Sequence, residues 1–189
     1  MATPTPRRAL GVRAHSGWAA YVVLSGPGPE IVARGRIVLC ASADTKMLYH
    51  TAEPMAFARA ERFIADCRAT TATLADKALA EIGPVVSCCI LTASGKPLPA
   101  LDRILASHAL IHAAEGEFYR DALDEACTRA GIAVRRVRER DIVEEAEHLP
   151  AWRERLAGFG KRLGAPWTQD EKLSALGAWL VLAARRSKR

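Results

Sequence analysis

The stretch ALGVRAHSGWAAYVVL, residues 9–24, decides how the fold begins. Valine and tyrosine recur along it, and both residue types favour extended backbone. We predict one strand over Leu10–Leu24, bent near Gly17, where a Gly–Trp pair interrupts the apolar run. The next six residues, SGPGPE, are typical of a turn, and IVARGRIVL, residues 31–39, resumes the extended pattern. The two stretches are predicted to pair as an antiparallel hairpin.

Helical and extended segments alternate along the rest of the chain. The segment VVSCCILT, residues 85–92, is almost entirely apolar, which is typical of a central strand covered on both faces. A further strand is predicted in IAVRRVRERDI, residues 132–142, and a loop or short third strand in residues 40–53. Helical spacing predicts helices over Glu53–Ile82, Ala100–Ala130 (with a break at Gly116 and a cap at Gly131), Val143–Leu163 (interrupted near Pro150) and Gln169–Arg185.

This order of elements predicts an α/β fold. An antiparallel hairpin that leads into parallel strands, with helices between them, gives a mixed β-sheet flanked by helices. That is the plan of the ribonuclease H-like fold. The length of 189 residues and the lack of a linker or repeat favour a single domain over residues 1–189. Residues 1–8 and 186–189 are expected to fray at its ends.

The net charge of +6 has two interpretations. A basic protein is suited to a polyanionic partner such as nucleic acid. Ordinary solvated arginines produce the same balance, because a charge excess alone does not locate a binding surface. The basic stretches VRRVRER and RRSKR are the segments that would follow a phosphate backbone.

The cysteine pattern and the apolar runs favour a cytoplasmic location without a membrane segment. The five cysteines have no C-x-x-C spacing, so neither a zinc knuckle nor a disulfide framework is predicted. The start MATPTPRRAL has no apolar stretch of a secretory signal. The longest apolar run, ALGAWLVLAA, is too short to cross a bilayer.

The first stretch resembles the RuvC-type Holliday-junction resolvases, a family with the ribonuclease H-like fold. Those proteins begin with a pattern of the form L-G-I-D-P-G-S followed by G-Y-G-V, and LGVRAHSGWAAYVV aligns with it without a gap. The matching positions are Leu10, Gly11, Val12, Ser16 and Tyr21. The first catalytic aspartate of the family falls on Arg13 of this chain.

Later segments extend the resemblance. DEKLSALGAWLVLA resembles the closing helix of the family, whose last aspartate would fall near Ser174 and whose partner acid would fall near Glu171. The glutamate expected on the central strand falls within VSCCI, where there is none. The resemblance implies Mg²⁺ or Mn²⁺ held between carboxylates, a nucleic-acid partner and a homodimer. Arg13 would repel such a metal, and it either holds a phosphate directly or points away from the site.

The stretch SHALIHAAEGEFYR, residues 107–120, concentrates polar groups on one helical face. His108, His112, Glu115 and Tyr119 follow the spacing i, i+4, i+7 and i+11, near the apolar stripe that is expected to face the sheet. Three interpretations remain open: ligands of a divalent transition metal, histidines hydrogen-bonded within the core, or a histidine acting as general acid or base. His50, in LYHTAE, is a further candidate.

A site near the ends of the first central strands and the last helix would bring distant candidates together. We expect His15, Glu115 and Asp170 or Glu171 to meet there. The segment TQDE also predicts a helix start, with Thr168 and Glu171 as a capping box. The candidate catalytic residues are His15, His108, His112, Glu115 and Asp170; the candidate substrate-binding residues are Arg13, Arg120 and Lys172; the candidate metal ligands are Glu115, Asp170 and Glu171.

Three functions are consistent with these residues. The first is a divergent RuvC-like nuclease or nucleic-acid-processing protein that acts on phosphodiesters with a divalent metal. The second is a non-catalytic nucleic-acid-binding or assembly module on the same fold, with salt-sensitive binding and no metal-dependent turnover. The third is an enzyme on a small phosphorylated substrate, with Arg13 on the phosphate.

Overall fold

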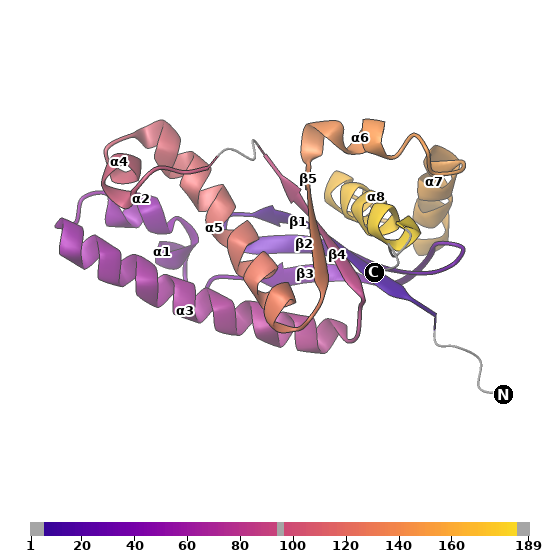
Figure 1. Cartoon of the computed structure of the whole chain (residues 1–189), viewed down its shortest axis with the longest axis horizontal. Coiled ribbons are helices and arrows are strands. Elements are labelled where there is room, and N and C mark those ends of the chain that lie inside the picture. Colours follow the sequence, from indigo (N-terminus) through magenta and orange to yellow (C-terminus); the bar gives the residue numbers. More distant parts are fainter. Residues whose placement is uncertain (1–5, 94–96, 185–189) are drawn as a thin grey trace, which may run out of the picture.

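The computed structural model describes residues 6–93 and 97–184, and its centre is a five-stranded mixed sheet (Figure 1). The strand order is β3-β2-β1-β4-β5. Strands β1, β2 and β3 are antiparallel, whereas β4 pairs in parallel with both β1 and β5. The strands are β1 (Arg8–His15), β2 (Trp18–Ser25), β3 (Glu30–Val38), β4 (Ser87–Thr92) and β5 (Ala133–Arg138).

The stretch predicted as one bent strand folds as two. β1 ends at His15 and β2 begins at Trp18, and these two residues pair across the tight turn between them. Gly17 occupies this turn with a φ of 79°, a conformation that glycine adopts without steric cost. At Gly17 the chain therefore reverses its direction completely, where only a bend was predicted. The result is a three-stranded antiparallel meander where a two-stranded hairpin was expected.

Helices cover both faces of the sheet, and β4 is covered by helices on both of its faces. All six residues of β4 are buried, as the apolar run predicted. On one face, α3 (Phe57–Ile82) and α5 (His108–Arg129) pack over a core that includes Leu10, Cys88 and Phe118. On the other face, α6 (Ile142–Glu145), α7 (Trp152–Leu163) and α8 (Gln169–Ala183) pack over a second core (Figure 1).

Two predicted segments differ from the observed structure. Residues 40–53 contain two short helices, α1 (Ala43–Lys46) and α2 (Leu48–Ala52), where a loop or strand was expected. The long helix after β4 breaks between α4 (Leu101–Leu105) and α5, not at Gly116. Gly116 stays helical, and a Cβ there would lie 2.9 Å from Nη1 of Arg120, so the glycine leaves room for that side chain.

The prediction that the chain ends fray can be compared with the structure only near residue 8. Arg8 begins β1, so the expected fraying does not extend to it. Residues 1–5 and 185–189 lie outside the described residues, and the second range is the whole of the basic RRSKR stretch that was considered for phosphate binding. In the described part of the chain, no helix is both long and apolar enough to cross a membrane.

β1 and α8 are in backbone contact, and this contact positions the candidate site. A Cβ on Gly11 would lie 1.8 Å from the carbonyl oxygen of Ser174 and 2.6 Å from the amide nitrogen of Ala178. Only glycine permits that approach, since the obstructing atoms belong to the backbone. The close approach holds the first turn of α8 beside the end of β1 (Figure 1).

Candidate functional site at the end of the first strand

Arg13 and His15 stand on the face of the sheet that α8 covers. Side chains alternate along a strand, and Leu10, Val12 and Ala14 belong to the core under α3 and α5. The odd-numbered residues of β1 therefore face the opposite layer. The first turn of α8 is fixed there by the predicted capping box: Thr168 Oγ1 accepts from the Glu171 amide (3.3 Å), and Glu171 Oε2 accepts from the Thr168 amide (2.7 Å).

Arg13 lies between two carboxylates. Its Nε and Nη2 donate to the two oxygens of Glu139 at 2.8 and 2.7 Å, in a bidentate fork, and its Nη1 donates to Asp170. The hydrogen bond with Glu139 is the largest cause that raises the pKa of Arg13. Arg13 therefore stays charged, and its charge balances one acid from the segment that follows β5 and one from α8.

His15 continues this arrangement across the end of the sheet. Its Nε2 lies 3.1 Å from Oδ1 of Asp170, and its ring stacks on Trp18 with centroids 4.4 Å apart and an interplanar angle of 16°. The guanidinium of Arg36, on β3, lies over Trp18 at 3.7 Å from the ring centroid. We call Arg36, Trp18, His15, Asp170 and Arg13 the edge row.

Asp170 connects the two halves of the edge row. Burial is the largest single influence on the pKa of Asp170 and raises it. The hydrogen bonds and charges of Arg13 and His15 oppose that effect and together outweigh it, so the pKa of Asp170 lies below its ordinary value. An ionised Asp170 therefore holds both neighbours in place.

The residues at this site do not fit a magnesium centre. Leu91 of β4, which pairs in register with Arg13, is apolar and buried. Ser174, where the last acid of the resembled pattern was expected, is fully buried, and its hydroxyl donates to the carbonyl of Ala20 at 3.3 Å. Asp170, one turn earlier, is the acid that reaches position 13. It meets a guanidinium there, and a cation already fills the space that a hard metal would need between carboxylates.

Two other predicted members of this site have different roles. Glu171 is used in the helix cap and in an ion pair with Arg34, whose Nη1 lies 2.9 Å from Oε1. Lys172, also on α8, has no ion pair within the described residues. Arg120 lies in the other layer, where its Nε donates to the Leu91 carbonyl (3.1 Å) and its Nη1 to Glu117 (2.9 Å).

Glu115 does not join His15 and Asp170, contrary to expectation. It projects from α5, in the layer on the opposite face of the sheet, and is only 1 % exposed. Its Oε1 accepts from the backbone amides of Tyr49 (3.0 Å) and His50 (3.2 Å) and contacts Nδ1 of His50 at 3.1 Å. Glu115 and Tyr119 are buried, as the predicted helical face required, but α5 lies in the layer opposite to the one expected.

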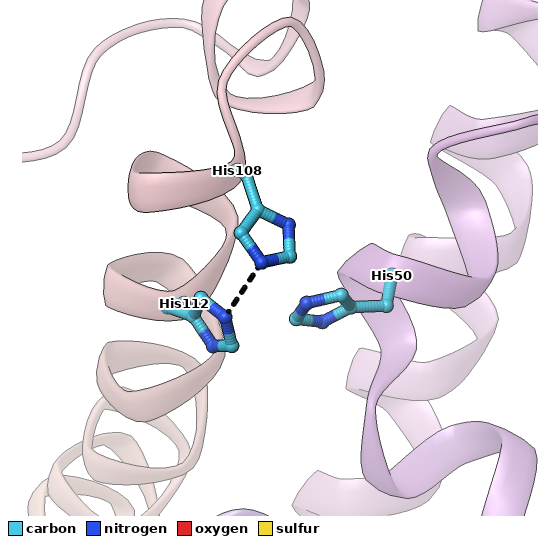
Figure 2. A group of neighbouring side chains, drawn as sticks. All are labelled: His50, His108 and His112. Atoms are coloured by element: carbon cyan, nitrogen blue, oxygen red, sulfur yellow. Dashed lines mark hydrogen bonds between the residues drawn. The ribbon is translucent and has the colours of Figure 1, made fainter.

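His108 and His112 also lie away from the edge row. Both are exposed at the start of α5, beyond the sheet, so they do not point into the core as one interpretation held. Their Nε2 atoms are 3.1 Å apart, and the ring of His50 from α2 lies 5.2 Å from His108 and 4.7 Å from His112 (centroids). Figure 2 shows the three rings meeting between the two helices. We call them the histidine cluster.

Three residues of the site were missed in the sequence. Trp18 and Arg36 were assigned no role, although a tryptophan after a turn glycine and the alternating R-G-R pattern of residues 34–36 are visible in the sequence. Glu139 had no such signal, because only the parallel pairing of β4 and β5 brings its segment next to Arg13.

Sheet order, strand directions and the position of the last helix define a ribonuclease H-like fold. Within that class the chain has the fold of RuvC. The structure of "T. thermophilus RuvC in complex with Holliday junction substrate" shares 12% identity over 92% of this chain and 91% of that chain, with a TM-score of 0.55. A second Thermus thermophilus RuvC structure shares 13% identity over 92% of both chains, with a TM-score of 0.50. No family model and no curated protein matches the sequence.

Proposed function

We propose that this protein is a nucleic-acid-binding domain of RuvC-like fold that binds its partner without metal-dependent cleavage. The edge row is the observation that carries the proposal. It places a guanidinium, an indole and an imidazole in one continuous stack at the open end of the sheet. At the other end of the edge row, Arg13 occupies the position where the metal chemistry of the resembled family needs an acid.

The composition of the edge row suits unpaired nucleotides. Aromatic rings stack on bases of any sequence, and arginine adds both a cation–π contact and a positive charge next to phosphate. No ion pair joins Arg36 to an acidic side chain within residues 6–93 and 97–184, so its charge is not neutralised locally. By contrast, Arg135, Arg136 and Arg138 of β5 all pair with acids. Arg36 is therefore better suited to contact a phosphate than the paired arginines of β5 are.

The binding test uses labelled single-stranded, duplex and four-way-junction DNA, the last because a RuvC of the same fold is known in complex with a Holliday junction. The Trp18 ring holds the Arg36 guanidinium and the His15 imidazole in the stack, so Trp18→Ala should release both, and we expect binding of unpaired strands to weaken about 5- to 150-fold. Fluorescence anisotropy in EDTA measures the affinity, and circular dichroism verifies that the variant is folded.

Arg36→Ala and Arg129→Ala form a matched pair. Each removes one positive charge, but Arg129 pairs with Asp76 in the layer on the other face. We expect Arg36→Ala to weaken binding and to lower the slope of log affinity against log salt by about 1, with Arg129→Ala unchanged. Equal effects of the two variants would show that binding depends on overall charge alone and would overturn the proposed surface.

One contact favours a second function, metal-independent cleavage of the bound strand. The His15–Asp170 pair has the form of an oriented general base. This function requires cutting that persists in EDTA and disappears in His15→Ala. Binding of a small phosphorylated substrate through Arg13 has less support, because its Nε, Nη1 and Nη2 already donate to carboxylates.

A further inference from the structure

We propose that the histidine cluster, His50, His108 and His112, is a binding site for a divalent transition-metal ion of the Zn²⁺ type. The ion would join α2 to the start of α5. Glu115 would act behind His50 as its hydrogen-bond partner, not as a ligand. This site is separate from the edge row, and the proposal does not depend on nucleic-acid binding.

The geometry of the cluster matches such an ion. His108 and His112 are separated by one helical turn, and one ligand nitrogen from each of the three histidines lies within 4.8 Å of the others. The Nε2 atoms of His108 and His112 are 3.1 Å apart. Two nitrogens at about 2.0–2.1 Å from one tetrahedral Zn²⁺ are about 3.3 Å apart. The limit of 4.8 Å exceeds that value, so the His50 ring, which lies between the two helices in Figure 2, would move toward the other two rings when all three bind one ion.

Glu115 fixes the chemical form of His50. An ionised carboxylate only accepts hydrogen bonds, so Nδ1 of His50 is the donor to Oε1 and carries the proton. With Nδ1 as the donor, Nε2 is the nitrogen that is left to bind a metal. A carboxylate on the far nitrogen of a histidine is the usual outer partner of a metal ligand, since it orients the ring and raises its basicity.

The burial of Glu115 is an independent reason to place a cation here. Its side chain is 2 % exposed, and its Oε2 has no hydrogen-bond partner within the described residues. No lysine or arginine pairs with it there, and the only basic side chain in contact is His50. A buried carboxylate is costly without a counter-charge. A metal on Nε2 of His50 would supply that charge through the ring.

The donor set selects the class of metal. Three imidazole nitrogens suit Zn²⁺, Co²⁺, Ni²⁺ and Cu²⁺, whereas Mg²⁺ and Mn²⁺ favour oxygen ligands. His108 and His112 are exposed, so the fourth coordination position faces solvent and is open to water. The site is therefore expected to take Zn²⁺ and to ignore Mg²⁺, the opposite of a two-metal nuclease centre.

Titration of the metal-free protein with ZnCl₂ in a calorimeter tests the site, with His112→Ala as the disrupting variant and His148→Ala as the control. His148 is also exposed but lies outside the cluster. We expect one equivalent to bind wild type and His148→Ala, and affinity to fall at least 100-fold in His112→Ala. Zn²⁺ should raise the thermal midpoint of the first two only. Equal binding by His112→Ala, or no binding by wild type, would overturn the proposal.

Two further measurements identify the ligands. Co²⁺ bound by wild type should give the visible absorption of a four-coordinate ion, and this absorption should be lost in His50→Ala. Glu115→Gln keeps the shape of the side chain but removes its charge, and we expect Zn²⁺ affinity to fall about 10- to 100-fold without being lost. Unchanged affinity in Glu115→Gln, with a folded protein by circular dichroism, would contradict the role given to Glu115.

Discussion

The identity of one side chain at the end of β1 determines which cation lies between Glu139 and Asp170. With arginine at position 13, the positive charge is covalently attached, and both acids are satisfied by hydrogen bonds. With an acid at that position, three carboxylates would converge without a counter-charge. In this chain, ion pairs with Arg13 therefore link the two acids.

Arg13→Asp should make the stability of the protein depend on a bound divalent metal ion. The variant should be less stable than wild type in EDTA, because like charges then face one another. Added Mg²⁺ or Mn²⁺ should raise its thermal midpoint, since oxygen donors from three acidic residues suit these ions. Differential scanning fluorimetry measures both effects. Wild type, titrated in parallel, should show no Mg²⁺ response, and an equal response in both proteins would contradict this account of Arg13.

Asp170 predicts a pH dependence of stability. Its folded-state pKa is lowered, so its contribution is fully present above the unfolded-state value of about 3.9. That contribution disappears as the pH falls through the lower folded-state value. Urea unfolding should therefore show a larger stability difference between wild type and Asp170→Asn at about pH 7 than at about pH 3. A difference that is constant with pH would mean that the carboxylate does not stabilise the fold as an ion.

At the scale of elements, the contact between β1 and α8 explains why the chain has a glycine at position 11. Local patterns predicted both elements and the cap of α8. They could not predict the turn at Gly17, where a strand-like sequence reverses, or that residues 40–53 form helices that carry His50. They also predicted the helix α5 but not the face of the sheet on which it packs. Helical spacing shows which residues share a face of the helix, but not which side of the sheet that face covers.

Gly11→Ala should be strongly destabilising. The new methyl group would meet backbone atoms of α8 at 1.8 and 2.6 Å, and these cannot rotate away as a side chain can. We expect a loss of about 3 kcal/mol or more in the free energy of unfolding. Gly28→Ala is the control, as a Cβ at that position has nothing within 4 Å. Chemical denaturation of both variants measures the difference, and similar stabilities would argue against the close approach of β1 and α8.

At the scale of the whole molecule, the sheet separates two groups of functional candidates. The edge row lies on the α8 face, whereas the histidine cluster and Glu115 lie in the layer of α3 and α5. Most members of both groups were predicted from the sequence, because polar and charged residues near the ends of predicted strands and helices can be recognised without a structure. The prediction combined the two groups into one site. The strand order β3-β2-β1-β4-β5, which the local patterns do not give, is needed to decide which face of the sheet each helix covers.

The most direct test of the central claim is incubation of labelled four-way-junction and single-stranded DNA with the protein, in EDTA and in Mg²⁺ or Mn²⁺, with binding and cutting followed in the same samples. We expect affinity to be the same in EDTA and in metal at constant ionic strength, and the DNA to remain intact in both. Cutting that requires Mg²⁺ or Mn²⁺ would contradict the account, because it would mean that a metal centre forms despite Arg13.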